Sequence, residues 1–155
     1  MRIIALLALC LLPALPAQAN WRVTDDGSAI IETDGSSALS LRCDNNANTG
    51  NKPGWLLKVD ALSLRQQSSR MEMVFRFPGH APLRLMGDNR NGSVQIDSMT
   101  QATQGDLQTL LRRLKSASRV TVTLINDASG AAMEPLVFGL RGSSRAIGQV
   151  AKACQ

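Results

Sequence analysis

The fold is decided by one stretch, Pro135-Leu136-Val137-Phe138-Gly139-Leu140-Arg141-Gly142-Ser143-Ser144-Arg145-Ala146-Ile147, which leads on to Cys154. Its apolar first half predicts a strand over 134–140, and Gly142 predicts a tight turn. Ser143 or Ser144 suits the cap of a helix that follows. That helix carries Cys154, and Cys43 is the obvious mate for it. A Cys43–Cys154 bridge would clasp the two ends of one small domain.

The first nineteen residues have the three parts of a cleaved export signal. Arg2 supplies a positive start, residues 3–12 form an apolar run, and Ala17-Gln18-Ala19 is a small-x-small cleavage site. This run is too short to span a bilayer, and nothing later is apolar enough to do so. We therefore expect a signal peptide at 1–19 and a single β-rich exported domain at 20–155, periplasmic or secreted. The alternative is a lipoprotein anchored through Cys10, although Leu9 stands where a small residue is expected.

Cysteine usage fits that compartment. Residues 20–155 keep two cysteines, an even number, as is typical of exported domains. The bridge would close a loop that spans most of the exported chain, which the chain-entropy model values at about 4–5 kcal/mol. A redox-active pair is the alternative, but the sequence has no Cys-x-x-Cys motif to support it.

The charge balance is mildly basic. Removing Arg2 from seventeen Lys and Arg leaves sixteen against twelve Asp and Glu, a net charge of +4. Such a charge favours weak, salt-sensitive contact with anionic surfaces. Nucleic-acid binding would require basic residues interleaved with stacking rings. The exported part has five aromatic residues and no Tyr, so we expect no nucleic-acid partner.

Alternating apolar residues predict a mainly-β domain. Period-two patterns and turn signals place strands at 21–24, 29–33, 39–43, 55–64, 71–77, 83–86, 94–96, 118–125 and 134–140. The Asn91-Gly92 pair predicts a hairpin turn. Leucines at 107, 110, 111 and 114 predict a helix over 106–116, with Asp106 at its N-terminus. Together these elements predict an α+β fold, a small antiparallel β-sandwich-like domain with two short helices and one disulfide.

The polar segment Asp44 to Gly54 is predicted to be a loop. Asp44, Asn46 and Asn48 alternate like the first ligands of a calcium loop. Gly50 comes one position late, however, and Trp55 stands where a bidentate Glu would close the site. We favour a turn in which these side chains bond their own backbone. The three residues are candidate interaction residues, together with Arg112 and Arg113.

No pattern in the chain predicts catalysis. The single histidine, His80, lies in a Pro-Gly-His-Ala-Pro turn, and there is no Gly-x-Ser-x-Gly motif to present a nucleophile. Asp25 and Asp26 are adjacent in a turn, where we expect them to be solvated. One histidine and two bridged cysteines do not make a zinc site. We therefore expect no catalytic residue, no cofactor and no metal.

Several segments carry a family resemblance: Leu39-Ser40-Leu41-Arg42-Cys43-Asp44, residues 55–62, Val74-Phe75-Arg76-Phe77, and 138–147 with Cys154. Their pattern resembles the TagO/VasI family of periplasmic proteins associated with type VI secretion. The resemblance implies a small β-rich domain with a strand-to-helix junction that ends in a cysteine. It implies no catalytic residue.

These features predict a non-catalytic periplasmic accessory or binding protein of the cell envelope. Its partner would be a cell-envelope protein or an anionic wall polymer, and the oligomeric state stays open. The alternative is a periplasmic inhibitor or immunity-type protein against a wall hydrolase or toxin, which would insert the loop 44–54 or 88–92 into its target. A wall hydrolase ranks third, because no base and nucleophile stand out.

Overall fold

The computed structural model describes residues 20–33, 36–49, 52–66, 70–97 and 101–154. The expected leader at 1–19 lies outside these residues and stays a prediction. Nine strands are described: β1 Arg22–Val23, β2 Ala29–Thr33, β3 Ser37–Thr49, β4 Lys52–Ala61, β5 Arg70–Arg76, β6 Leu83–Arg90, β7 Ser93–Asp97, β8 Arg119–Asn126 and β9 Leu136–Gly139. The helices are the 3-10 helix η1 Leu62–Gln66, α1 Gln101–Ser116 and α2 Ser143–Ala153.

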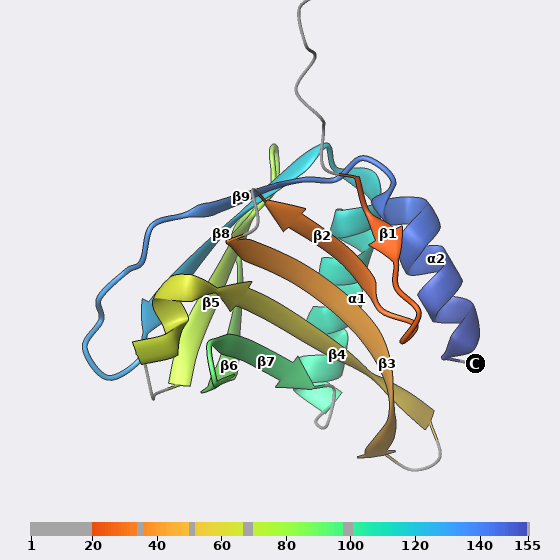
Figure 1. Ribbon diagram of the computed structural model, residues 1–155, viewed down its shortest axis with the longest axis horizontal. Coiled ribbons are helices and arrows are strands. Elements are labelled where there is room, and N and C mark those ends of the chain that lie inside the picture. Colours follow the sequence, from red (N-terminus) through yellow and green to blue (C-terminus); the bar gives the residue numbers. More distant parts are fainter. Residues whose placement is uncertain (1–19, 34–35, 50–51, 67–69, 98–100, 155) are drawn as a thin grey trace, which may run out of the picture.

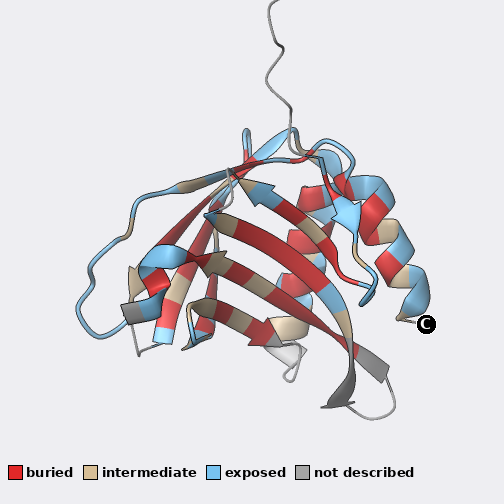
Figure 2. Ribbon diagram, in the orientation of Figure 1, coloured by how far each residue is buried: buried red, intermediate tan, exposed pale blue. Residues whose placement is uncertain are grey.

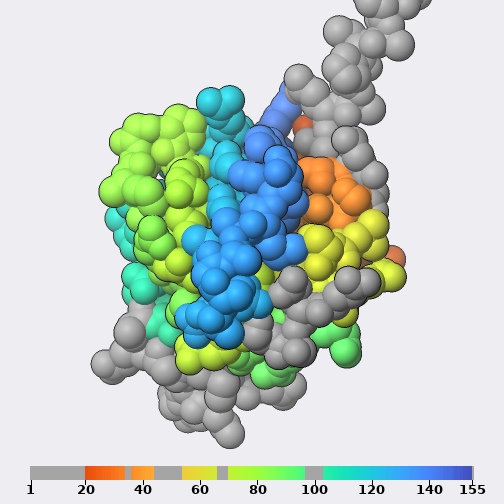
Figure 3. All heavy atoms as spheres, turned by 90° about the vertical axis from the view of Figure 1, so that its left-hand side faces the viewer, coloured from red at the N-terminus to blue at the C-terminus, as the bar shows by residue number. Residues whose placement is uncertain are grey.

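All nine strands belong to one antiparallel sheet in the order β1-β2-β3-β4-β7-β6-β5-β8-β9. The sheet curls into a half-barrel around α1, and α2 lies beside β1 (Figure 1). The segment 127–135, between β8 and β9, extends along one side of the molecule. Figure 3 looks at that side and shows this blue segment between the green strands and the orange and yellow residues of β2 to η1. The expected mainly-β domain with two helices is confirmed, as one curled sheet packed on helices.

The core fills the space between the curled sheet and the two helices. Alternate strand residues point inward, which gives the banded burial of Figure 2. α1 contributes Leu107, Leu110, Leu111 and Leu114 to this core, and α2 contributes Ala146, Ile147 and Val150. All five aromatic residues of 20–155 are buried: Trp21, Trp55, Phe75, Phe77 and Phe138.

Two contacts tie the ends of the described chain into the sheet. Cys43 of β3 is bridged to Cys154 at the end of α2, with Cα atoms 5.4 Å apart, so the predicted disulfide is confirmed. The Trp21 indole N–H donates to the Gly139 carbonyl at 3.2 Å, and the Trp21 backbone N–H donates to the Arg141 carbonyl at 3.3 Å. The start of the described chain is thereby held against the segment at the end of β9.

The hairpin prediction at Asn91-Gly92 is also confirmed. Both residues have positive φ, 55° and 89°, and they connect β6 to β7. A two-residue turn of this kind matches the right-handed twist of the flanking strands.

Several local predictions are wrong. The strand predicted over 55–64 ends at Ala61, and residues 62–64 belong to η1; residues 88–90 of the predicted loop 88–92 continue β6. The segment 44–54 is no loop, because β3 continues to Thr49 and β4 begins at Lys52, with Thr49 opposite Lys52 and an irregular register between Asp44 and Thr49. Pairing that starts in the well-packed part of the hairpin overrides the weak strand propensity of Asn and Gly.

Helix α1 begins at Gln101, five residues before the predicted start at Asp106, which lies in its second turn. One glycine, Gly105, costs a helix only about 1 kcal/mol and does not stop it.

The predicted serine cap of α2 is replaced by Gly142, the N-cap residue, in the left-handed conformation with φ 83° and no side-chain cap.

Candidate anion-binding site

The outward face of the sheet, opposite α1, carries most of the charged strand residues. Register places Ser40 beside Lys58, Lys58 beside Gln95, Gln95 beside Asp88, and Asp88 beside Arg70. This row crosses β3, β4, β7, β6 and β5. Because neighbouring strands are about 4.8 Å apart, it places charges from distant parts of the sequence within reach of one ligand.

An opening in the sheet lies beside this row. β6 and β7 pair only where Asp88–Arg90 faces Ser93–Gln95, whereas residues 83–87 of β6 pair with β5 alone. Where the two strands part, the surface sinks into a depression of about 500 Å³. We call it the arginine depression; it is lined by Arg42, Leu56, Arg70, Met86, Gly87, Asp88, Arg90, Gln95, Ile96 and Thr103.

The arginine depression is rich in positive charge, which comes from Arg42, Arg70 and Arg90. All three are exposed, and none forms an ion pair with another described residue. Elsewhere on the same face, Arg22 pairs with Glu32 at 2.7 Å and Arg84 with Glu72 at 2.8 Å. Among its described lining residues, one carboxylate, Asp88, stands against three guanidinium groups, a net charge of +2 for this part of the chain. Guanidinium forks match carboxylate and phosphate groups bidentately, so the depression suits an anion.

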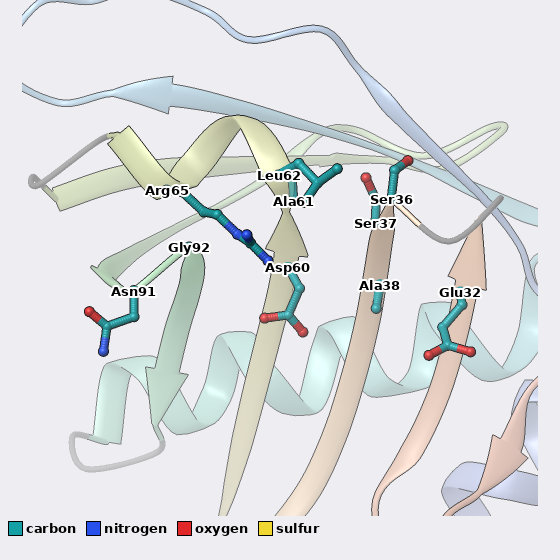
Figure 4. Close-up of a pocket in the computed structure, with 10 residues that line it drawn as sticks. All are labelled: Glu32, Ser36, Ser37, Ala38, Asp60, Ala61, Leu62, Arg65, Asn91 and Gly92. Atoms are coloured by element: carbon teal, nitrogen blue, oxygen red, sulfur yellow. The ribbon is translucent and has the colours of Figure 1, made fainter.

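Two neighbouring depressions lack this excess of positive charge. One, of about 250 Å³, shares Arg42 and Leu56 with the arginine depression and balances Arg42 and Lys58 against Asp26 and Asp60. The other, of about 320 Å³, is shown in Figure 4, where the Arg65 side chain of η1 extends toward Asp60. Glu32 lines it too, so carboxylates outnumber its one guanidinium. Of the three depressions, the arginine depression is therefore the best candidate for an anionic ligand.

The candidate interaction residues chosen from the sequence lie elsewhere. Arg112 is exposed on α1, and Arg113 donates from Nη1 to the Ala81 carbonyl at 2.7 Å, which ties α1 to the turn after β5. The backbone of Asp44, Asn46 and Asn48 belongs to β3, but their side chains lie outside the described part of the chain. The calcium hypothesis for these residues therefore stays untested.

Other residues whose side chains could take part in catalysis or metal binding also lie apart from one another. His80 is exposed in its turn. Asp26 accepts hydrogen bonds from the side chains of Thr24 and Ser28, which lower the pKa of its carboxyl below the ordinary value of 3.8. Among the described residues, no three His, Cys, Asp or Glu side chains gather in a way that could hold a metal ion.

The three arginines of the depression were not found by sequence reasoning. The alternation of residues 39–43 does place Arg42 on the outward face, opposite Leu41. Arg70 and Arg90, however, come close to Arg42 only because β7 and β6 follow β4 in the sheet order. Sequence spacing carries no signal for that order.

Comparisons with protein-family models, with curated proteins and with solved structures found no match to this chain. Within the residues that the structure describes, no helix is both long and apolar enough to cross a membrane. The chemistry of the site is therefore inferred from its own residues.

Proposed function

We propose that this chain is a non-catalytic binding protein of the bacterial cell envelope, which acts in the periplasm or after secretion and recognises an anionic group of its partner. The observation that carries the proposal is the arginine depression, with three guanidinium groups that pair with no described carboxylate and a net charge of +2 over its described lining residues. The partner supplies carboxylates or phosphates, as an anionic wall polymer or an acidic envelope protein would. The TagO/VasI resemblance supports a role associated with type VI secretion.

Two further observations support binding without chemistry or nucleic acid. The described lining residues include the hydroxyl of Thr103 but no His or Cys, so no histidine stands beside Thr103 and Asp88 to complete a nucleophile–base pair of the usual kind. The five aromatic side chains of the exported part are all in the core, so none is available on the surface to stack on bases.

The test compares a triple variant, Arg42→Gln, Arg70→Gln and Arg90→Gln, with the wild-type protein spanning 20–155. A matched control, Arg119→Gln, Arg145→Gln and Lys152→Gln, removes the same charge from exposed positions outside the depression. Each protein is used for pull-down from envelope extract and for co-sedimentation with purified peptidoglycan at low and moderate salt. We expect the depression variant to lose binding by about tenfold or more, and the control to lose far less. Equal losses in the two variants would reject the arginine depression as the binding site.

The inhibitor hypothesis is the second candidate, and one observation favours it. β2 pairs with β3 only as far as Leu41, and β7 pairs with β4 only from Leu56, so the hairpin beyond these residues has no described flanking strand. Figure 1 shows this two-stranded arm projecting past the sheet. Projecting segments of this kind carry binding function in many proteins. Capture of a wall hydrolase whose activity falls on binding would favour this candidate over the first.

A further inference from the structure

We infer that the arginine depression takes an extended acidic polypeptide segment, which pairs its main chain with the unpaired edge of β6. This inference rests on the proposed function and specifies the chemistry of its ligand. Three features carry it: the direction of the β6 backbone groups, the side chains around the opening, and the absence of surface rings.

The first feature follows from hydrogen-bond alternation. The Asp127 N–H donates to the Arg70 carbonyl at 3.0 Å, so the backbone groups of Arg70 face β8. Directions alternate along a strand, so the next residue, Met71, faces β6 and bonds Gly87, its partner in the register. The backbone groups of Met86, one residue away from Gly87, therefore point away from β5, toward the opening.

The same alternation applies to Arg84. No described strand pairs with Met86 or Arg84 on the side of the opening, because β7 faces β6 only as far as Asp88. The N–H and C=O groups of these two residues are thus positioned to bond an added strand. An extended peptide that adds to a sheet edge gains its affinity from such main-chain bonds and its specificity from side-chain pockets.

The second feature is the mixture of charge and apolar surface around the opening. Arg42, Arg70 and Arg90 lie among its lining residues, while Leu56 and Ile96 are buried beneath and Met86 is 38 % exposed. Alternate side chains of an extended peptide point to opposite faces about 6.6–7 Å apart along the chain. A segment that alternates Asp or Glu with aliphatic residues would present carboxylates on the outward face, to the guanidinium groups, and apolar side chains on the inward face, toward Ile96.

The third feature separates a polypeptide from a wall glycan. Since all five rings of the exported part are buried, a sugar strand would find no aromatic platform on this face. A glycan also has no regular row of donors and acceptors that matches a strand edge, whereas a peptide has one. The unpaired edge and the arginines together therefore favour a peptide.

The experiment titrates the protein spanning 20–155 with three labelled hexapeptides. The first alternates Asp and Val, the second alternates Asn and Val, and the third is the first with N-methyl groups on alternate amides. We expect the Asp peptide to bind, and the Asn and N-methylated peptides to bind about tenfold more weakly or worse, because each loses one class of bond. Equal binding of the methylated and unmethylated peptides would overturn the inference.

A pair of proline variants tests the same point from the protein side. Met86→Pro removes the N–H that faces the opening and spares the bonds to β5. The control is Val137→Pro on the edge strand β9. The Val137 N–H also points away from the neighbouring strand β8. The Leu140 N–H donates to the Ser118 carbonyl on the β8 side, and Val137 lies three residues before Leu140, so its backbone groups face the opposite way. Only Met86→Pro is expected to weaken the Asp peptide, by about tenfold. Should Met86→Pro fail to fold, the peptide comparison on the wild-type protein decides alone.

The outcomes separate the inference from the proposed function. If purified peptidoglycan binds and the triple arginine variant abolishes that binding, while no peptide binds, the inference is wrong and the proposed function stands. If neither peptidoglycan, peptides nor any envelope protein binds in an arginine-dependent way, both are wrong. Peptide binding that needs both the arginines and the Met86 N–H supports both.

Discussion

The hydroxyl of Ser143 donates a hydrogen bond to the carbonyl of Leu114 at 2.6 Å, and Ser143 is only 2 % exposed. Leu114 lies in the last turn of α1, where carbonyl groups have no partner within the helix. A serine at the start of α2 therefore satisfies the end of α1. The position of Ser143 after Gly142 would suit a residue that caps α2. Its side chain instead donates to the last turn of α1.

This relationship predicts that Ser143→Ala is destabilising. Removal of the hydroxyl leaves a buried carbonyl without its donor, which costs about 1–3 kcal/mol. Ser144→Ala is the matched control, because Ser144 is exposed at the next position of the same helix, and its change should stay within about 0.5 kcal/mol. Urea unfolding followed by circular dichroism measures both. Equal midpoints for the two variants would contradict a structural role for the bond.

The disulfide predicts a second loss of stability. Cys43 and Cys154 are separated by 111 positions, so the bridge restricts a large part of the unfolded chain. We expect Cys43→Ser with Cys154→Ser to lower the free energy of unfolding by about 2–4 kcal/mol. Because Ala146, Ile147 and Val150 of α2 are buried in the core, the helix should remain docked and unfolding should remain cooperative. Wild-type protein under reducing conditions is the control and should show a similar loss. An unchanged midpoint would contradict the estimate.

The parts of the fold that the sequence predicts well are those with a strong local signal. Alternation in residues 71–77, the leucine spacing in α1 and the Asn91-Gly92 turn each depend on residues close together in the chain, and all three are confirmed. The Cys43–Cys154 pair was predictable because residues 20–155 contain no other cysteines. The start of α1 and the hairpin at 44–54 were missed because pairing and packing there override weak local preferences.

The candidate site was less accessible to sequence reasoning. Arg42, Arg70 and Arg90 lie on β3, β5 and β6, whose order in the sheet is not the order in the chain. The depression also forms only because β6 and β7 separate beyond the Asp88–Gln95 pair, on the side away from their hairpin turn. No short sequence motif predicts this separation. Arg112 and Arg113 stood out because they are adjacent, yet Arg113 serves to hold the Ala81 turn.

Asp26 predicts a specific response to acid. Hydrogen bonds from Thr24 and then Ser28 lower the pKa of its carboxyl in the folded protein, whereas the unfolded chain keeps the ordinary value of 3.8. The stabilisation is therefore complete above the unfolded pKa and is lost as the pH falls below it, toward the depressed folded pKa. Asp26→Asn should reduce stability at neutral pH and flatten its decline between neutral pH and about pH 3. Thermal melts of wild type and variant across this range measure the effect.

Asp25→Asn provides the control for that experiment, because Asp25 makes none of the hydrogen bonds that hold Asp26. Its melts should follow the same pH profile as the wild type. A wild-type profile that Asp26→Asn leaves unchanged would show that these turn hydrogen bonds do not persist in solution.

A substitution at Gly87 tests how closely β6 packs against β7 where the two strands part. A Cβ atom at this position would lie 2.8 Å from the Gln95 carbonyl oxygen and 2.8 Å from Val94 Cγ1. The carbonyl belongs to the β7 backbone and cannot move without shifting that strand, so Gly87→Ala should cost about 1–3 kcal/mol. Gly139→Ala on β9 is the control, since a Cβ there meets no atom within 4 Å. Unfolding of both variants in guanidinium chloride measures the difference in their free energies of unfolding. If Gly87→Ala matches Gly139→Ala in stability, β6 and β7 lie further apart than this contact requires, and the floor of the arginine depression is wider than described.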